Sequence, residues 1–295
     1  MKTKTSIHAL IQLLDDPNVE VMEHAKRVLL NYGDEIIPEL EKIEDASLRD
    51  PVQMENVASI LKALRFQRVK NLLSEWINDD EKDLMKAVYA INAYQFPDLN
   101  IQDFVMKFQD LKHSCWREMN PKQTSFEKIE VLNKVFFKKF EFTRVQRGYS
   151  SPFEIYLDSV LDTKEGTDLS IALIYSLIAQ SLDLPVYCVV SSNHRTPIVL
   201  SYLDQTGLLP ILNWGIHNNG VLFYILIQEK GLIIDPSNLK EKYNQEGLPE
   251  HKSQFEPSPN TLIIKRYLTD LRNSYANYAH LRHKMKDIED LLILF

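Results

Sequence analysis

Glycine and cysteine are scarce in this 295-residue sequence, which contains eight glycines and two cysteines. Few glycines suit a helix-rich chain with short connections. Cys115 and Cys188 form no CxxC pair and no Cys/His spacing, so neither a disulfide framework nor a zinc site is indicated. The sequence also lacks a glycine-rich phosphate loop, a His/Glu metal helix and a serine elbow. We therefore expect no metal and no cofactor.

Basic residues are in deficit, because 34 Lys and Arg face 41 Asp and Glu and give a formal net charge of -7. Bulk electrostatics thus argue against nucleic acid as a partner, although they leave a local basic patch open. No apolar run reaches transmembrane length. The first residues, MKTKTSIHALIQLLDD, lack the apolar core and small-residue cleavage site of a signal peptide. We expect a cytoplasmic protein that is not bound to a membrane.

The N-terminal third repeats a short helix, an Asp/Pro turn and a longer amphipathic helix, at a spacing of roughly 30–35 residues. This pattern resembles degenerate HEAT-type repeats, and the alternative is an irregular helical bundle. We expect residues 1–95 to be helical throughout and stacked as antiparallel pairs. The expected helices cover residues 6–14, 19–33, 35–43, 50–66, 72–78 and 79–94, followed by 101–112 and 126–138.

Residues 164–194 organise the rest of the chain. Residues 168–182 are apolar on most of the helical circumference, which predicts a central buried helix. Pro185 ends this helix, and residues 186–190 form the first expected strand. We expect further strands, in an antiparallel sheet packed on this helix, at 197–204, 208–215, 221–228 and 232–237. Residues 239–258 are expected to form a polar loop, and 260–294 to form two helices.

Several of these segments resemble a known family, the transglutaminase-like superfamily, and within it the SirB-type branch. They are VLNKVFF (131–137), IYLDSVLDTKEGTDLSIALIY (155–175), LDLPVYCVV (182–190) and His194. The resemblance implies an α+β protein with a papain-like core, in which a central buried helix packs on an antiparallel sheet. We expect a HEAT-like helical repeat domain (1–110), a transglutaminase-like core (111–256) and a tetratricopeptide-like helical hairpin (257–295). The alternative for the hairpin is a packing element that covers the sheet or the repeats.

In this superfamily the nucleophile is a cysteine at the start of the central helix, where helix amides and a nearby histidine lower its pKa. Gly166 and Ala172 fit the family's frame, and the cysteine position falls on Asp168. The resemblance implies that His194 is the family's histidine. The third position is either Asp235, which precedes a proline as in the family, or Leu226. Asp168, His194 and Asp235 are thus the candidate catalytic positions of a vestigial triad.

Each candidate also has a structural interpretation. Asp168 suits a helix cap, and we expect its side chain to accept a hydrogen bond from a first-turn amide. His194 could serve as a hydrogen-bonding residue at the mouth of a groove. Cys115 and Cys188 are expected to be buried structural thiols. Ser170 has no reason to point at the same spot as Asp168, and His217 is expected in a solvated turn.

The leading hypothesis is a non-catalytic, degenerate transglutaminase-like protein that acts as a protein-binding or scaffold module. The expected partner is another protein, bound through the helical-repeat surface. The alternative is a hydrolase or amide-transfer enzyme with a non-standard site around Asp168, His194 and Asp235. Convergence of these three side chains in an open cleft would favour the enzyme. The sequence leaves the oligomeric state open.

Overall fold

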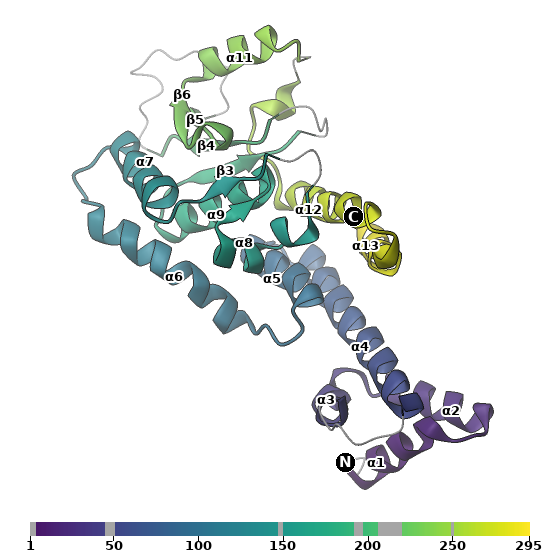
Figure 1. The fold of residues 1–295 in the computed structure, drawn as a ribbon. Coiled ribbons are helices and arrows are strands. Elements are labelled where there is room, and N and C mark those ends of the chain that lie inside the picture. The colour runs from purple at the N-terminus through teal and green to yellow at the C-terminus, as the bar shows by residue number, and fades with distance from the viewer. Residues whose placement is uncertain (1–3, 45–50, 147–149, 192–196, 206–219, 249–250) are drawn as a thin grey trace. The chain divides into compact units, whose positions relative to one another are not determined.

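A computed structural model of the protein describes residues 4–44, 51–146, 150–191, 197–205, 220–248 and 251–295 (Figure 1). The chain divides into two compact units, residues 1–75 and 76–295. The proposed division into three domains, with boundaries after residues 110 and 256, stays a prediction.

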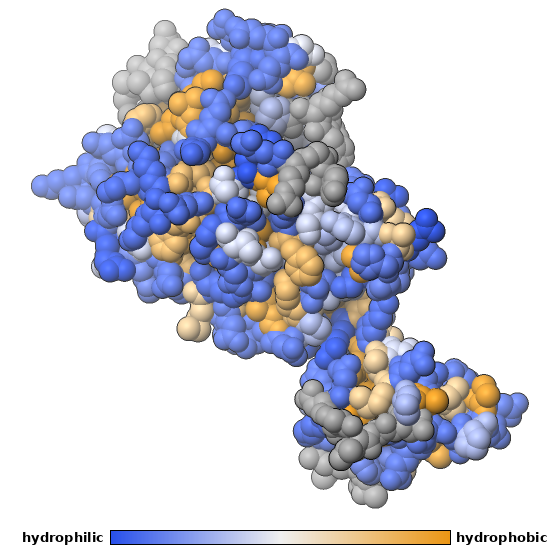
Figure 2. All heavy atoms as spheres, in the orientation of Figure 1, coloured by the Kyte–Doolittle hydropathy of each residue, from blue (hydrophilic) through white to orange (hydrophobic). Residues whose placement is uncertain are grey.

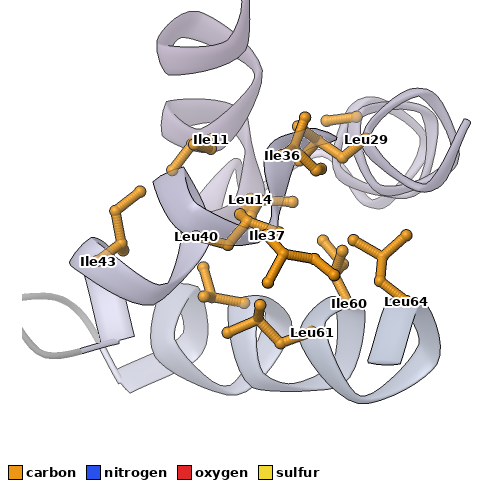
Figure 3. Close-up of a cluster of buried hydrophobic side chains, with 12 residues drawn as sticks. Ile11, Leu14, Leu29, Ile36, Ile37, Leu40, Ile43, Ile60, Leu61 and Leu64 are labelled. Atoms are coloured by element: carbon orange, nitrogen blue, oxygen red, sulfur yellow. The ribbon is translucent and has the colours of Figure 1, made fainter. Parts of the chain in front are cut away.

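The first unit consists of helices around one apolar core. It contains α1 (Lys4–Gln12), α2 (Val19–Leu30), α3 (Ile37–Glu44) and most of α4 (Pro51–Asn78). Figure 3 shows apolar side chains from these helices pointing toward one another, among them Leu29, Leu40 and Leu61. Two buried amides add polar ties, because Gln53 donates to the Ile11 carbonyl at 3.0 Å and Asn56 to the Leu14 carbonyl at 2.6 Å.

Helix α4 corrects one expectation for this part of the chain. Residues 50–66 and 72–78 are not two helices but one helix of 28 residues, because the segment between them contains neither proline nor glycine and continues the apolar face with buried Val69. In the described part of residues 1–95 every regular element is helical, as predicted. Stacking as antiparallel repeat pairs stays a prediction.

The second unit combines helices with a four-stranded sheet, so the prediction of a mixed α+β protein is confirmed. The strands β3 (Val186–Val189), β4 (Val199–Leu203), β5 (Val221–Leu226) and β6 (Leu232–Ile234) are antiparallel and lie in the order β3-β4-β5-β6. A short parallel pair joins β1 (Thr143–Arg144) to β2 (Glu165–Gly166). The helices before the sheet are α5 (Leu84–Gln95), α6 (Ile101–Glu118), α7 (Ser125–Asn133), α8 (Leu157–Thr163) and α9 (Asp168–Ser181).

Helix α9 lies at the centre of this unit, against β3 and β4 (Figure 1). Every residue from Leu169 to Ala179 is buried, which confirms the prediction from its all-round apolar composition. The few polar side chains inside are bonded: Ser176 donates to the Val186 carbonyl at 2.9 Å, and the Tyr175 hydroxyl donates to Asn133 at 2.9 Å.

The segment after β6 differs from the expected strand and loop. The strand ends at Ile234, and residues Pro236–Gln245 form helix α11. Asp235 caps this helix and Pro236 is its first residue, a combination that favours helix starts. The expected strand at 208–215 lies outside the described residues.

The last two helices pack against the rest of the second unit. Helix α12 (Asn260–Ala276) contacts α13 (Arg282–Leu292) and α5. Two buried tyrosines of α12 form hydrogen bonds with the segment before α8. The Tyr267 hydroxyl donates to the Ile155 carbonyl at 3.0 Å, and the Tyr275 hydroxyl lies 2.9 Å from that of Tyr156. The two expected C-terminal helices are therefore present, and their assignment as a tetratricopeptide-like hairpin stays a prediction.

Hydrophilic residues cover most of the described surface on the face shown in Figure 2, with smaller apolar areas between them. Among the residues that the structure describes, no helix combines the length and apolarity needed to cross a membrane.

Candidate functional site

The backbone just before α9 lies in close contact with the side chain of Val160. A Cβ atom at Gly166 would lie 2.8 Å from Val160 Cγ1, so a larger residue does not fit without rearrangement. The parallel pairing of β1 with β2 sets Arg144 opposite Gly166. The Thr167 amide donates to the Glu154 carbonyl at 2.9 Å. These contacts fix the first turn of α9 and bring the Arg144 side chain beside it.

A cavity of about 840 Å³ opens at this first turn. We call it the Asp168 pocket. Its walls come from β1, the first turn of α9, the end of β5, the turn Ile227–Glu229 that follows, α11 and α12. Its volume lies within the range of about 300–1,000 Å³ that is typical of ligand sites. All of these elements belong to the second unit.

Asp168 contributes a charged side chain to this pocket, with 28% of the side chain exposed. Its Oδ1 atom lies 3.0 Å from Nε of Arg144, and its Oδ2 atom accepts a hydrogen bond of 3.3 Å from Gln228. Arg144 and Gln228 belong to segments that no sequence pattern connected with Asp168.

The cap of α9 is Thr167, so the expectation that Asp168 caps this helix is wrong. Thr167 has the extended backbone of an N-cap, φ -69° and ψ 164°, and its hydroxyl accepts from the Ser170 amide at 3.3 Å. Asp168 is the first helical residue, and its carboxylate is used in the ion pair instead. Ser170 is buried and donates to the Ile155 carbonyl at 2.8 Å, which excludes it from the pocket as expected.

Asp235, one of the other two candidate positions, does not contact Asp168 in the described structure. Asp235 Oδ1 accepts from the Ser237 and Asn238 amides at 2.9 and 3.1 Å, which caps α11, and Asp235 does not line the pocket. Leu226, the alternative third position, does line it. His194 and His217 lie outside the described residues. A triad of Asp168, His194 and Asp235 stays a prediction.

Both cysteines are buried, which confirms their structural interpretation. Burial raises the pKa of the Cys115 thiol to about 12, and burial likewise raises the pKa of the Cys188 thiol to about 12. Neither residue lines the Asp168 pocket. The protein therefore presents no cysteine thiolate to this pocket.

Several pocket residues were missed by the sequence analysis. Nζ of Lys242 on α11 lies 2.6 Å from Oε1 of Glu229, and Nε of Arg266 on α12 lies 2.9 Å from Oδ1 of Asp270. The α12 residues were within reach of a pattern argument, because Arg266, Asp270, Asn273 and Asn277 recur at helical spacing and so share one polar face of the helix. Within the described ranges, no three His, Cys, Asp or Glu side chains gather as ligands for a metal.

Comparison with known proteins identifies relatives of the chain. It is 35% identical over 117 residues to a UPF0162 protein of Buchnera aphidicola subsp. Baizongia pistaciae, covering 38% of this chain and 42% of the relative. It is 22% identical over 210 residues to a UPF0162 protein of Xylella fastidiosa (strain 9a5c), covering 68% of each chain. The match thus spans less than half of the Buchnera protein and about two thirds of the Xylella protein. No solved structure matches.

A family model described as "Transglutaminase-like superfamily" matches residues 102–269, more than half of the 295 residues. The match includes Arg144, Asp168 and Leu226, and it ends within α12, before Asn273. The fold agrees with this match, since a buried central helix packs on an antiparallel sheet. The chain belongs to the transglutaminase-like superfamily.

Proposed function

We propose that this protein is a non-catalytic member of the superfamily that acts as a protein-binding or scaffold module. The observation that carries the proposal is the Asp168–Arg144 ion pair at the position where the superfamily's enzymes hold their nucleophilic cysteine. A thiolate is a strong nucleophile near neutral pH. A carboxylate is a weak one, and its charge here is compensated by a guanidinium 3.0 Å away.

The partner in this proposal is another protein, and its docking site is the helical surface of the first unit, which we interpret as HEAT-like. That unit exposes large apolar side chains despite its own buried core: Val19 is 64% exposed and Val52 is 52% exposed. Isolated apolar side chains are common on surfaces, and substitution of these two valines tests whether they bind a partner. Membership of the SirB-type branch and a cytoplasmic location complete the proposal.

A second candidate function is supported by the Asp168 pocket itself. Its volume of about 840 Å³ suits a substrate, and Asp168 lines it. A hydrolase or amide-transfer enzyme would use Asp168 with His194 and a carboxylate, Asp235 in the sequence analysis, as an altered triad. The capping bonds of Asp235 on α11 disfavour this candidate.

Catalysis can be tested with dimethylated casein and a fluorescent primary amine, by following ammonia release and amine incorporation. We expect wild-type protein to release no more ammonia and incorporate no more amine than the blank. Turnover by wild-type protein that disappears in Asp168→Asn, with an unchanged thermal midpoint, would replace the non-catalytic proposal by the enzyme.

The partner site can be tested by crosslinking capture from native cell extract with the full-length protein. We expect a captured protein to be lost from the Val19→Glu/Val52→Glu variant. The matched control is Met106→Glu/Phe153→Glu, which alters two exposed apolar residues of the second unit, 66% and 52% exposed, and should capture as wild type does. Capture that depends on the second pair instead would move the docking site away from the helical unit.

A further inference from the structure

The last turns of α12 supply one wall of the Asp168 pocket. Asn273 and Asn277, both exposed and one helical turn apart, line it. They lie beyond residue 269, where the family match ends. This wall therefore lies outside the matched part of the chain.

Among the described lining residues of the pocket, three are cationic and four are acidic, and each of them contacts a residue of opposite charge. Its three cationic residues each contact a carboxylate, with N–O distances of 3.0 Å for Arg144–Asp168, 2.6 Å for Lys242–Glu229 and 2.9 Å for Arg266–Asp270. A charged ligand would compete with these pairs for its own contacts. An uncharged polar ligand would leave them intact, so the pocket favours a neutral ligand.

The two asparagine amides retain hydrogen-bonding capacity toward the pocket. Asn273 Oδ1 accepts from Arg272 at 3.3 Å, and Asn277 Nδ2 donates to the Asn273 carbonyl at 3.3 Å. A carboxamide has two donors and two lone pairs. Within the described structure, the Asn273 amino group can thus still donate to a ligand, and the Asn277 carbonyl oxygen can still accept.

The spacing of these amides matches an extended peptide. Residues i and i+4 of an α-helix are about 6 Å apart along the axis. Alternate residues of an extended peptide are about 6.6–6.8 Å apart. One amide can therefore bond a backbone carbonyl of the peptide while the other bonds a backbone N–H two residues along.

The remaining lining suits the side chains of such a peptide. Other lining residues contribute aliphatic groups, including Val145, Leu169, Ile198 and Leu226. Aliphatic walls favour the burial of apolar side chains. A sugar would instead be favoured by several aromatic side chains, which could stack on the C–H faces of its ring. Tyr243 is the one aromatic residue among the described lining residues.

We propose that the Asp168 pocket binds an extended, uncharged peptide segment, whose backbone is held by Asn273 and Asn277. This inference rests on the proposed non-catalytic function and names a ligand for a site distinct from the surface of the first unit. The bound peptide stays intact, because the pocket offers an ion pair rather than a thiolate.

The test measures retention of a pool of N-acetylated, C-amidated hexapeptides, randomised over Ala, Ser, Val and Leu, on the immobilised full-length protein. We expect wild type to retain part of the pool, and Asn273→Leu/Asn277→Leu to lose about tenfold in retention through the two lost hydrogen bonds. The matched control is Asn244→Leu, an exposed asparagine of α11 that does not line the pocket. The single variant Asn277→Ala repeats the test with a smaller change.

Mass spectrometry of the retained peptides separates this inference from the proposed function. Equal retention by wild type and both asparagine variants, or no retention at all, would overturn the peptide site and leave the non-catalytic proposal standing. Retention of maltohexaose in place of the peptides would also overturn it. Asparagine-dependent retention of peptides that emerge cleaved would support the site and overturn the non-catalytic proposal.

Discussion

Nε of Arg144 lies 3.0 Å from Oδ1 of Asp168. This pair connects β1 to the first turn of α9, and the parallel pairing of Arg144 with Gly166 sets its geometry. The pair consists of two groups that neutralise each other. The stability and reactivity of this end of the helix follow from that arrangement.

Thr167 should matter more for stability than Asp168. Replacing Thr167 by Ala removes the N-cap of α9, and we expect the free energy of unfolding to fall by about 0.5–2 kcal/mol. Replacing Asp168 by Ala removes a partly exposed ion pair, which should cost about 1 kcal/mol or less. Urea denaturation at pH 7 measures both, with Thr269→Ala inside α12 as a control that caps no helix. A larger loss for Asp168→Ala would contradict the assignment of the cap.

The native thiols should be inert. Because burial raises the pKa of Cys115 and Cys188 to about 12, we expect almost no thiolate and no reagent access at pH 8. Titration with a disulfide reagent should detect fewer than one thiol in folded protein and two after guanidinium unfolding. Rapid reaction of one thiol before unfolding would show that its site opens.

A cysteine introduced in place of Asp168 should be reactive. The first turn of α9 and the Arg144 guanidinium would both stabilise its thiolate, so its alkylation should show a pKa below the usual range. Iodoacetamide rates between pH 5 and pH 10 measure this effect, against an exposed control cysteine in Thr163→Cys. Adding Arg144→Ala should move the pKa of the new thiol upward. Identical profiles for the Asp168→Cys and Thr163→Cys thiols would mean that the site has lost its activating environment.

Gly231 should tolerate no side chain. It has φ +82°, and a Cβ atom there would lie 2.0 Å from Oδ1 of Asn133. Asn133 in turn donates to the Gly231 carbonyl at 2.7 Å and accepts from Tyr175. We expect Gly231→Ala to lower the free energy of unfolding by several kcal/mol, since it adds a clash to the left-handed backbone.

Gly247→Ala is the matched control for Gly231→Ala. Gly247 has φ +68° with open space around its Cβ position, so only the backbone term of roughly 1–2 kcal/mol should appear. The double variant Gly231→Ala/Asn133→Ala lacks the clash. We expect its loss in free energy of unfolding to be smaller than the sum of the losses in the two single variants. Equal losses in Gly231→Ala and Gly247→Ala would contradict the close contact with Asn133.

The start of α7 should be sensitive to acid. The Thr124 amide and hydroxyl both donate to the Glu127 carboxylate, at 2.7 and 2.9 Å, and hold its pKa below the usual range. A lowered folded-state pKa means that this contribution is complete above the unfolded-state pKa of about 4.3 and is lost as pH falls through the folded value. Glu127→Gln should show a smaller fall in urea midpoint between pH 6 and pH 3 than wild type does. Parallel curves would exclude this carboxylate as a source of acid sensitivity.

Local sequence patterns specify the central features of the second unit. The apolar residues of α9 surround its whole circumference, which predicts a buried helix, and Cys188 lies between Tyr187 and Val189 in an apolar strand segment. The sequence also contains the Asp235–Pro236 start of α11 and the segment within α4 that has no proline or glycine.

The surroundings of Asp168 depend on the folded structure. Arg144, Gln228 and Asn273 come from segments far apart in the sequence, and their meeting depends on β1 pairing and on how α12 packs through Tyr267 and Tyr275. Local patterns specify helices and strands because propensity and periodicity act over a few residues. Contacts between distant segments depend on the packing of the whole unit, which no short stretch of sequence contains.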